Sequence, residues 1–105
     1  MAVIVELTIV PLGVGVSLSK FLAPALSTLE ALKVKYEVTP MCTVFEAKDA
    51  DEALKIAKAA HEAIFKEGVR RVVTTIKIDD RRDIKRDMKD KVESLKKAVK
   101  NSSQS

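Results

Sequence analysis

The sequence predicts one α+β domain, in which a four-stranded antiparallel sheet carries two helices on one face and a further helix follows at the C-terminal end. Two observations predict it. Four short segments alternate apolar and polar residues, the pattern of a half-buried strand, and the segments between them repeat apolar residues at helical spacing. A chain of 105 residues is also long enough for one hydrophobic core.

The first strand is expected over residues 2–10, where the alternation leaves one face wholly apolar. The run Pro11-Leu12-Gly13-Val14-Gly15 predicts a turn after it. A helix should follow, with Ser17 or Ser19 as its N-cap. Pro24 predicts a bend in this helix or a late start. The buried stripe of the helix would consist of leucines three and four residues apart, namely Leu18, Leu22, Leu26, Leu29 and Leu32.

A β-hairpin is expected in the middle of the chain. Alternation runs from residue 34 to 39 and resumes from 43 to 48, and Pro40-Met41-Cys42 interrupts it. Asp49, followed three residues later by Glu52, forms a capping box and so predicts the start of the second helix. The buried face of that helix would comprise Ala53, Ile56, Ala57, Ala60, Ile64 and Phe65.

The last third of the chain predicts one more strand and one more helix. Gly68 should end the second helix as its C′ residue, and a fourth strand is expected over residues 71–79. A helix over residues 84–99 would complete a single domain of residues 1–100, leaving residues 101–105 as a disordered tail. The apolar stripe of this last helix is Ile84, Met88, Val92, Leu95 and Val99.

This order of elements, βαββαβ with an extra C-terminal helix, predicts a ferredoxin-like sandwich. Both crossover helices would cover the same sheet face, so the other face stays uncovered and the last helix has no surface of its own subunit left to cover. Apolar surfaces of this kind usually meet a partner, and we therefore expect a homo-oligomer, either a dimer or a tetramer. The uncovered face would display Ile4, Glu6, Thr8, Val10, Val73, Thr75 and Lys77.

Charge and composition narrow the range of partners. The positive excess falls on residues 81–105, but acids lie three or four positions from the basic residues there, which is typical of a solvated helix. With three Phe and one Tyr, a base-stacking surface is poorly supplied, so no nucleic-acid partner is expected. Glu6 and Pro11 interrupt the first apolar run, so no membrane span is expected either. The lone Cys42 indicates a reducing cytoplasm, and the near absence of Asn and Gln is typical of a thermophile.

The chain shows no recognisable catalytic or metal-binding constellation. His61 has no second histidine, cysteine or carboxylate pair at ligand spacing, and Cys42 has no base near it in sequence. A structural histidine and a passive turn cysteine are therefore favoured. An enzyme of the dimeric α+β-barrel kind stays open as an alternative, although only Glu6, Lys77 and Arg71 would face its active site. A regulatory or structural subunit with a protein partner is the other alternative.

From about Val3 to Leu95 the chain resembles the thiamine-binding protein family of small ferredoxin-like proteins. The likeness lies in a series of segments in fixed order. These are Val10-Pro11-Leu12-Gly13, Ser17-Leu18-Ser19-Lys20, Tyr36-Glu37-Val38-Thr39-Pro40-Met41, Thr43-Val44-Phe45-Glu46, His61-Glu62-Ala63, and Gly68-Val69-Arg70-Arg71-Val72 through Asp83. The glycines that usually flank the Thr-x-x-Glu stretch in the family are replaced here by Cys42 and Ala47.

The resemblance implies a non-catalytic protein that binds thiamine or its hydroxymethyl-aminopyrimidine part and assembles as dimers or tetramers. No cofactor is expected beyond thiamine as a possible ligand, and no metal. The predicted ligand-binding residues are Ser17, Ser19, Thr43 and Glu46. The carboxylate of Glu46 would face the cationic or amino group of the ligand, and the hydroxyls would supply hydrogen bonds.

Overall fold

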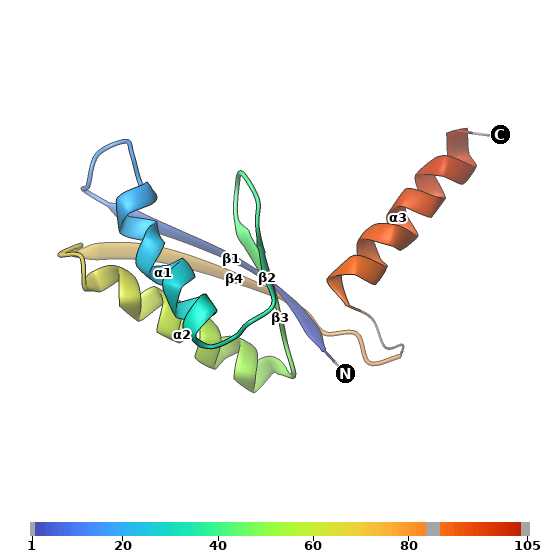
Figure 1. Ribbon diagram of the computed structural model, residues 1–105, viewed down its shortest axis with the longest axis horizontal. Helices are drawn as coiled ribbons and strands as arrows, with labels where there is room; N and C mark the ends of the chain where they lie inside the picture. Colours follow the sequence, from blue (N-terminus) through green and yellow to red (C-terminus); the bar gives the residue numbers. More distant parts are fainter. Residues whose placement is uncertain (1, 84–86, 104–105) are drawn as a thin grey trace.

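The computed structural model describes residues 2–83 and 87–103 and contains one four-stranded antiparallel sheet with three helices (Figure 1). Its elements in chain order are β1 (Val3–Leu12), α1 (Ser19–Ala31), β2 (Tyr36–Val38), β3 (Thr43–Ala47), α2 (Ala50–Phe65), β4 (Arg71–Asp79) and α3 (Met88–Ser103). The strands lie in the order β2-β3-β1-β4, and every neighbouring pair is antiparallel. This arrangement confirms the predicted α+β fold with an additional C-terminal helix.

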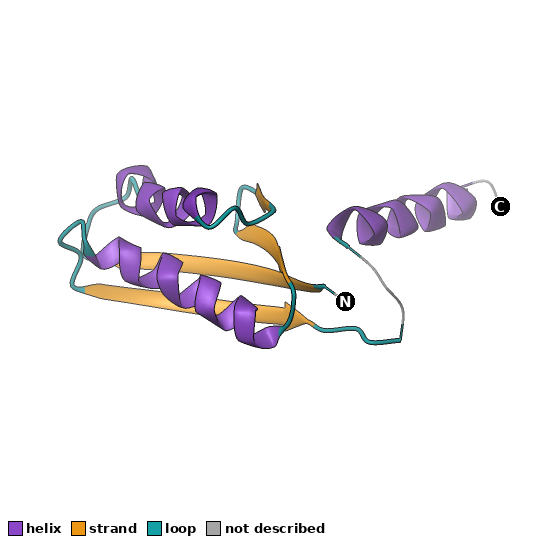
Figure 2. Ribbon diagram, turned by 60° about the horizontal axis from the view of Figure 1, so that its bottom comes forward, coloured by secondary structure: helices purple, strands orange, loops and turns teal. Residues whose placement is uncertain are grey.

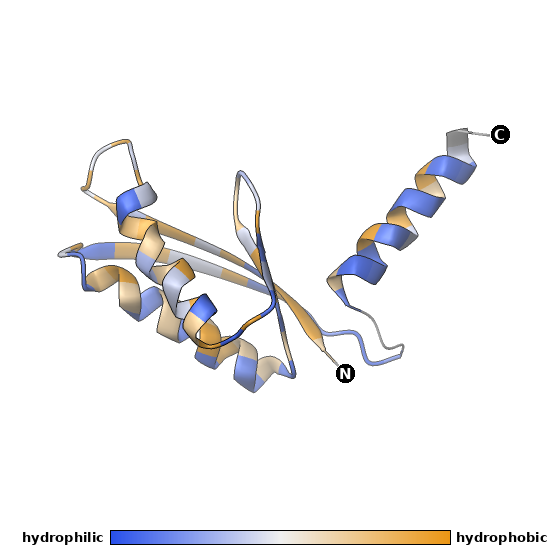
Figure 3. Ribbon diagram, viewed as in Figure 1, coloured by the Kyte–Doolittle hydropathy of each residue, from blue (hydrophilic) through white to orange (hydrophobic). Residues whose placement is uncertain are grey.

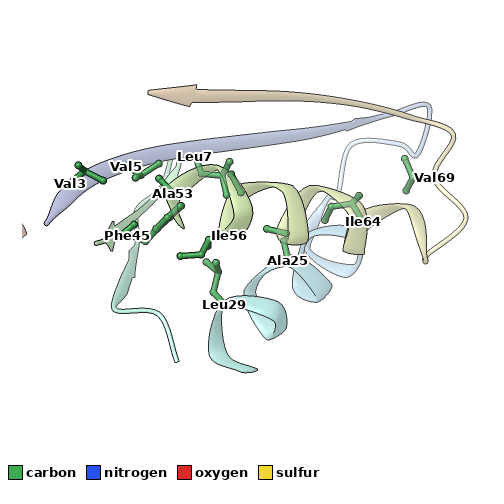
Figure 4. Close-up of a cluster of buried hydrophobic side chains, with 13 residues drawn as sticks. Val3, Val5, Leu7, Ala25, Leu29, Phe45, Ala53, Ile56, Ile64 and Val69 are labelled. Atoms are coloured by element: carbon green, nitrogen blue, oxygen red, sulfur yellow. The ribbon is translucent and has the colours of Figure 1, made fainter. Parts of the chain in front are cut away.

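Helices α1 and α2 lie on one face of the sheet, and the hydrophobic core fills the space between them (Figures 2 and 4). The alternation along β1 sets this face, because Val3, Val5 and Leu7 are buried while Glu6 is exposed. The largest fully buried side chains are Phe45, Leu29, Ile64, Val3 and Val5. The register of β1 with β4 confirms that Thr8, Val10, Val73, Thr75 and Lys77 share the opposite, uncovered face.

The start of α2 confirms the predicted capping box. The Asp49 carboxylate accepts a hydrogen bond from the Glu52 amide at 2.9 Å, and the Glu52 carboxylate accepts one from the Lys48 amide at 3.0 Å. Two amides at the helix start that have no partner within the helix are thereby paired. After the helix, Gly68 takes a φ of +85°, a left-handed conformation that favours glycine.

Replacing Asp49 by Ala should lower the free energy of unfolding by about 1 kcal/mol, since the Glu52 amide loses its acceptor. Urea denaturation followed by circular dichroism measures the change. Asp51→Ala is the matched control, because Asp51 lies in the same first turn and is exposed. Equal losses in the two variants would contradict the capping role of Asp49.

Several predictions for the first half of the chain are wrong. Strand β1 does not end before Pro11 but continues to Leu12, and the turn begins at Gly13 with a φ of +77°. Pro11 is tolerated because β3 pairs with β1 only as far as Leu7, so Pro11 lies on an edge. The N-cap of α1 is Leu18, which makes no side-chain cap bond.

Helix α1 nevertheless begins at Ser19 and runs through Pro24, so the expected late start is also wrong. Proline lacks the amide that would bond to the carbonyl four residues back, and so leaves only one carbonyl of the first turn without its helical donor. The hairpin strands are shorter than predicted. Strand β2 is confined to Tyr36–Val38, and β3 ends at Ala47.

Helix α3 begins at Met88 and ends at Ser103. The predicted start at Ile84 lies outside the described residues, and so do the last two residues of the predicted tail. Residues 101–103 are helical, so the prediction of a disordered tail is wrong for them; no Gly or Pro follows Val99 to end the helix. Asp87 caps the helix by accepting a hydrogen bond from the Asp90 amide at 2.8 Å, and this bond lowers the pKa of Asp87.

Beyond its first turn, helix α3 stands away from the sheet and the other two helices (Figure 1). The radius of gyration is 15.9 Å, whereas a compact chain of this length should have about 13 Å. Met88 is buried, but further along the helix Val92, Leu95 and Val99 are 47%, 66% and 62% exposed. Figure 3 shows hydrophobic bands alternating with hydrophilic ones along α3. The predicted apolar stripe therefore exists and, beyond Met88, is uncovered in one subunit.

Candidate functional site

A cavity of about 410 Å³ opens where β1 continues beyond Leu7, which pairs with Thr43, the first residue of β3. Its walls are the end of β1, helix α1 and the β2–β3 hairpin, and we call it the edge pocket. The residues that line it are Leu7, Thr8, Ile9, Val10, Leu18, Leu22, Ala25, Leu26, Leu29, Val38, Thr39, Pro40, Met41, Cys42 and Thr43. Its volume falls within the range of small-molecule sites.

The edge pocket is apolar because α1 turns its leucine stripe towards it. Leu22 and Leu26 are only partly buried, although they belong to the stripe that predicts a core-facing helix. Opposite them, β1 runs beyond its last pair with β3, so no strand lies beside it there and these side chains have no backbone to pack against on that side. A ligand with a flat apolar body could therefore bury surface here without displacing the core.

The hairpin wall is held in shape by Thr39. Its hydroxyl accepts hydrogen bonds from the amides of Met41 and Cys42 at 3.3 and 3.0 Å and donates one to the Cys42 carbonyl at 2.9 Å. These bonds fix the turn that separates β2 from β3. Met41 and Cys42 thereby come to lie on the wall of the pocket.

The structure brings only one of the predicted ligand-binding side chains into the edge pocket. Thr43, the first residue of β3, lines it. Ser17 and Ser19 are exposed and are not among the lining residues, although Leu18 between them is. Neither serine caps α1 with its side chain.

Glu46 lies away from the edge pocket. It is three residues after Thr43, and an odd spacing along a strand places two side chains on opposite faces. The Glu46 carboxylate accepts a hydrogen bond from the Met88 amide at 2.8 Å and lies 3.6 Å from the Lys35 ammonium. Glu46 therefore fastens the first turn of α3 to the sheet, and no carboxylate is found among the residues lining the pocket.

The histidine of α2 has a structural environment. His61 Nδ1 lies 2.6 Å from the hydroxyl of Thr74 on β4, and its ring contacts Phe65 edge-on at 5.3 Å between centroids. Within residues 2–83 and 87–103 no group of three His, Cys, Asp or Glu side chains is placed to hold a metal ion. No helix in the same residues is long and apolar enough to span a bilayer.

The chain is similar to known proteins along most of its length. The sequence model of the thiamine-binding protein family matches residues 5–96. This chain belongs to the thiamine-binding protein family. A UPF0045 protein of Methanothermobacter thermautotrophicus is 50% identical over 95 residues, which cover 90% of this chain and 96% of the relative. A UPF0045 protein of Bacillus subtilis is 40% identical over 99 residues, which cover 90% of this chain and 94% of the relative.

Solved structures agree with this assignment. A hypothetical protein of Methanocaldococcus jannaschii is 37% identical and superposes with a TM-score of 0.81, covering 90% of this chain and 95% of its own. A Thermotoga maritima protein, described as a proposed thiamine biosynthesis/salvage protein, superposes with a TM-score of 0.77 over 90% of this chain and 99% of its own. It is 22% identical, so this likeness concerns the fold alone.

Most of the pocket wall does not follow from the sequence patterns. The helical spacing places Leu22 and Leu26 in the core stripe, and the alternation makes residues 8–10 part of an ordinary strand. One signal was present in the sequence. Apolar alternation continues through Pro11 to Leu12, and a proline inside such a run indicates an edge, where a cavity beside the strand becomes possible.

Proposed function

We propose that this protein binds thiamine through its aminopyrimidine ring, or binds hydroxymethyl-aminopyrimidine itself, in the edge pocket and releases it unchanged. Membership of the thiamine-binding protein family supports the ligand class. The observation that carries the proposal is the apolar pocket of about 410 Å³ beside the part of β1 that has no β3 neighbour. Thr43 lies on the wall of this pocket.

The chemistry of the pocket suits the pyrimidine better than the thiazolium. The lining residues are all uncharged side chains, so a flat neutral ring can be buried there without loss of hydration of a charge. The cationic thiazolium of thiamine would stay at the mouth, in contact with water. Binding without a chemical step is the simplest use of a site lined by uncharged side chains.

Isothermal titration calorimetry tests this function with three probes, namely thiamine, hydroxymethyl-aminopyrimidine and hydroxyethyl-methylthiazole. The first two share the pyrimidine and should both bind and raise the melting temperature, because a ligand that binds only the folded state stabilises it. The thiazole alone should give no heat. Absence of heat and of a thermal shift with thiamine and with the pyrimidine at millimolar concentration would contradict the proposal.

Replacing Thr43 by Val should weaken pyrimidine binding about fivefold while leaving the fold intact. Valine keeps the shape of threonine but removes the hydroxyl, and one hydrogen bond contributes about 1 kcal/mol. Thr75→Val is the matched control, since Thr75 is exposed on the uncovered sheet face. If both variants bind as tightly as the original protein, the Thr43 hydroxyl does not contact the ligand.

Replacing Glu46 by Ala separates two roles for this residue. Because the Glu46 carboxylate accepts a hydrogen bond from the Met88 amide, its removal should accelerate hydrogen exchange at that amide. The affinity for the pyrimidine should change less than about twofold, since Glu46 lies away from the pocket and does not contact the ligand. Nuclear magnetic resonance measures both quantities. A large loss of affinity with unchanged exchange at Met88 would show that Glu46 contacts the ligand and does not hold α3.

We also propose that two or more copies associate through α3 and the uncovered sheet face. Val92, Leu95 and Val99 are exposed on α3, and Val73 is 46% exposed on the sheet. Such surfaces are usually buried in an assembly. We expect the assembly to be a dimer or a tetramer. The single cysteine cannot form a disulfide within the chain, which is typical of proteins in a reducing cytoplasm.

A further inference from the structure

The backbone of β1 has an unpaired edge inside the pocket. The hydrogen bonds of the neighbouring strands show which amides and carbonyls of β1 point towards this edge. The Glu46 amide donates to the Lys35 carbonyl at 3.0 Å, and the Thr39 amide donates to the Cys42 carbonyl at 2.8 Å. Even-numbered residues of the β3 strand and its turn therefore direct their backbone groups at β2. The odd-numbered residues, Thr43 and Phe45, must direct theirs at β1, because these directions alternate along a strand.

Thr43 and Phe45 pair with Leu7 and Val5, so the odd-numbered residues of β1 direct their amide and carbonyl towards β3. This pairing ends at Leu7, because the chain turns away at Cys42. The next odd-numbered residue is Ile9, which stands opposite Thr74 of β4 but directs its backbone groups the other way. In the described part of the chain no turn, loop or side-chain group supplies a partner for the Ile9 amide and carbonyl.

Pro11 supports this direction independently. It is the next odd-numbered residue and is buried within β1, yet a proline has no amide to donate. A proline in a strand is tolerated where its missing amide would have faced no partner. The lining of the pocket agrees, since Thr8 and Val10 belong to the wall although they share the uncovered face of the sheet. The edge of β1, rather than one of its faces, forms this wall.

We propose that the amide and carbonyl of Ile9 form the specificity-determining contact of the pocket and select a heterocycle with an amino group next to a ring nitrogen. The inference rests on the proposed function and adds the group that distinguishes one pyrimidine from another. The Ile9 amide donates to the ring nitrogen, and the Ile9 carbonyl accepts from the amino group. The two groups lie side by side on one residue, which matches a donor and an acceptor on neighbouring ligand atoms.

An unpaired backbone donor and acceptor on an apolar wall give strong discrimination. A ligand that pairs both groups restores the hydrogen bonds that water would make. A 4-oxo pyrimidine presents a carbonyl to the Ile9 carbonyl and an N–H to the Ile9 amide, so both contacts become repulsive. We therefore expect the amino compound to bind at least a hundredfold more tightly than its 4-oxo analogue, since sites that pair polar groups reject mismatched ones.

Two experiments test the inference. Calorimetry on the full chain compares hydroxymethyl-aminopyrimidine with the 4-oxo analogue. The same pair is then measured on Ile9→Pro, which removes the amide as Pro11 already does at the next equivalent position, and on Ile9→Ala, which keeps the amide and trims the side chain. Selectivity for the amino compound should persist in Ile9→Ala and fall at least tenfold in Ile9→Pro.

The outcomes separate this inference from the proposed function. Binding of neither pyrimidine by the original protein overturns the proposed function and the inference with it. Equal binding of both pyrimidines overturns the inference alone, and so does unchanged selectivity in Ile9→Pro. If Ile9→Pro does not fold, the comparison of the two ligands on the original protein still decides, and an amide-to-ester replacement at Ile9 removes the same donor with the side chain kept.

Discussion

Replacing Leu22 by Trp is expected to abolish pyrimidine binding, with a loss of affinity of at least a hundredfold. Leu22 lies on α1 where the helix faces the edge pocket and is only partly buried against the core. A tryptophan side chain that takes the direction of Leu22 enters the cavity, where its indole occupies the volume that the ligand ring would take. Because the cavity offers space for the indole, the free energy of unfolding should fall by no more than about 1–3 kcal/mol, which is what overpacking of a filled core costs, so the variant should still fold.

Leu54→Trp is the matched control for this experiment. Leu54 lies on α2, is 50% exposed and is not among the lining residues, so the same change in size should leave binding unaltered. Calorimetry with hydroxymethyl-aminopyrimidine measures both variants, and circular dichroism verifies the fold. Undiminished binding by Leu22→Trp would mean that the ligand sits elsewhere on the molecule.

Removing residues 84–105 is expected to convert the protein from an oligomer to a monomer. Three apolar side chains of α3 are exposed in one subunit, and fully burying each would contribute roughly 1.5–3 kcal/mol. Association through α3 removes this surface from water. Light scattering should therefore give the full chain at least twice the mass of one subunit, and the truncated chain the mass of one.

A point variant gives the same test without removing the helix. Leu95→Glu places a charge in the apolar stripe of α3 and should weaken association, whereas Lys96→Glu changes the neighbouring exposed residue and should not. An unchanged oligomeric state in both the truncated chain and Leu95→Glu would show that α3 does not hold the subunits together.

The sequence predicts the sheet well because the signals are local. Alternation along residues 71–79 gives β4 with the observed bounds, and the capping box at Asp49 gives the start of α2. Both depend on a period or on a contact within one helical turn. Packing of the elements against one another therefore does not change either signal.

The candidate site is predicted less well because it depends on tertiary structure. The edge pocket exists because β1 has ten residues and β3 has five, so one edge of β1 is left without a neighbour. No local pattern reports how long a neighbouring strand will be. Thr43 and Glu46 were grouped by resemblance to the family, whereas the period of a strand already separates two residues that are three positions apart.

The binding site is located most directly by following amide chemical shifts during titration with hydroxymethyl-aminopyrimidine. We expect saturable shifts at Ile9, Leu22 and Thr43, which come from the three walls of the edge pocket. Thr75 and Lys77 on the uncovered sheet face should not shift. Shifts centred on Thr75 and Lys77, with none at Ile9, would contradict this location of the binding site.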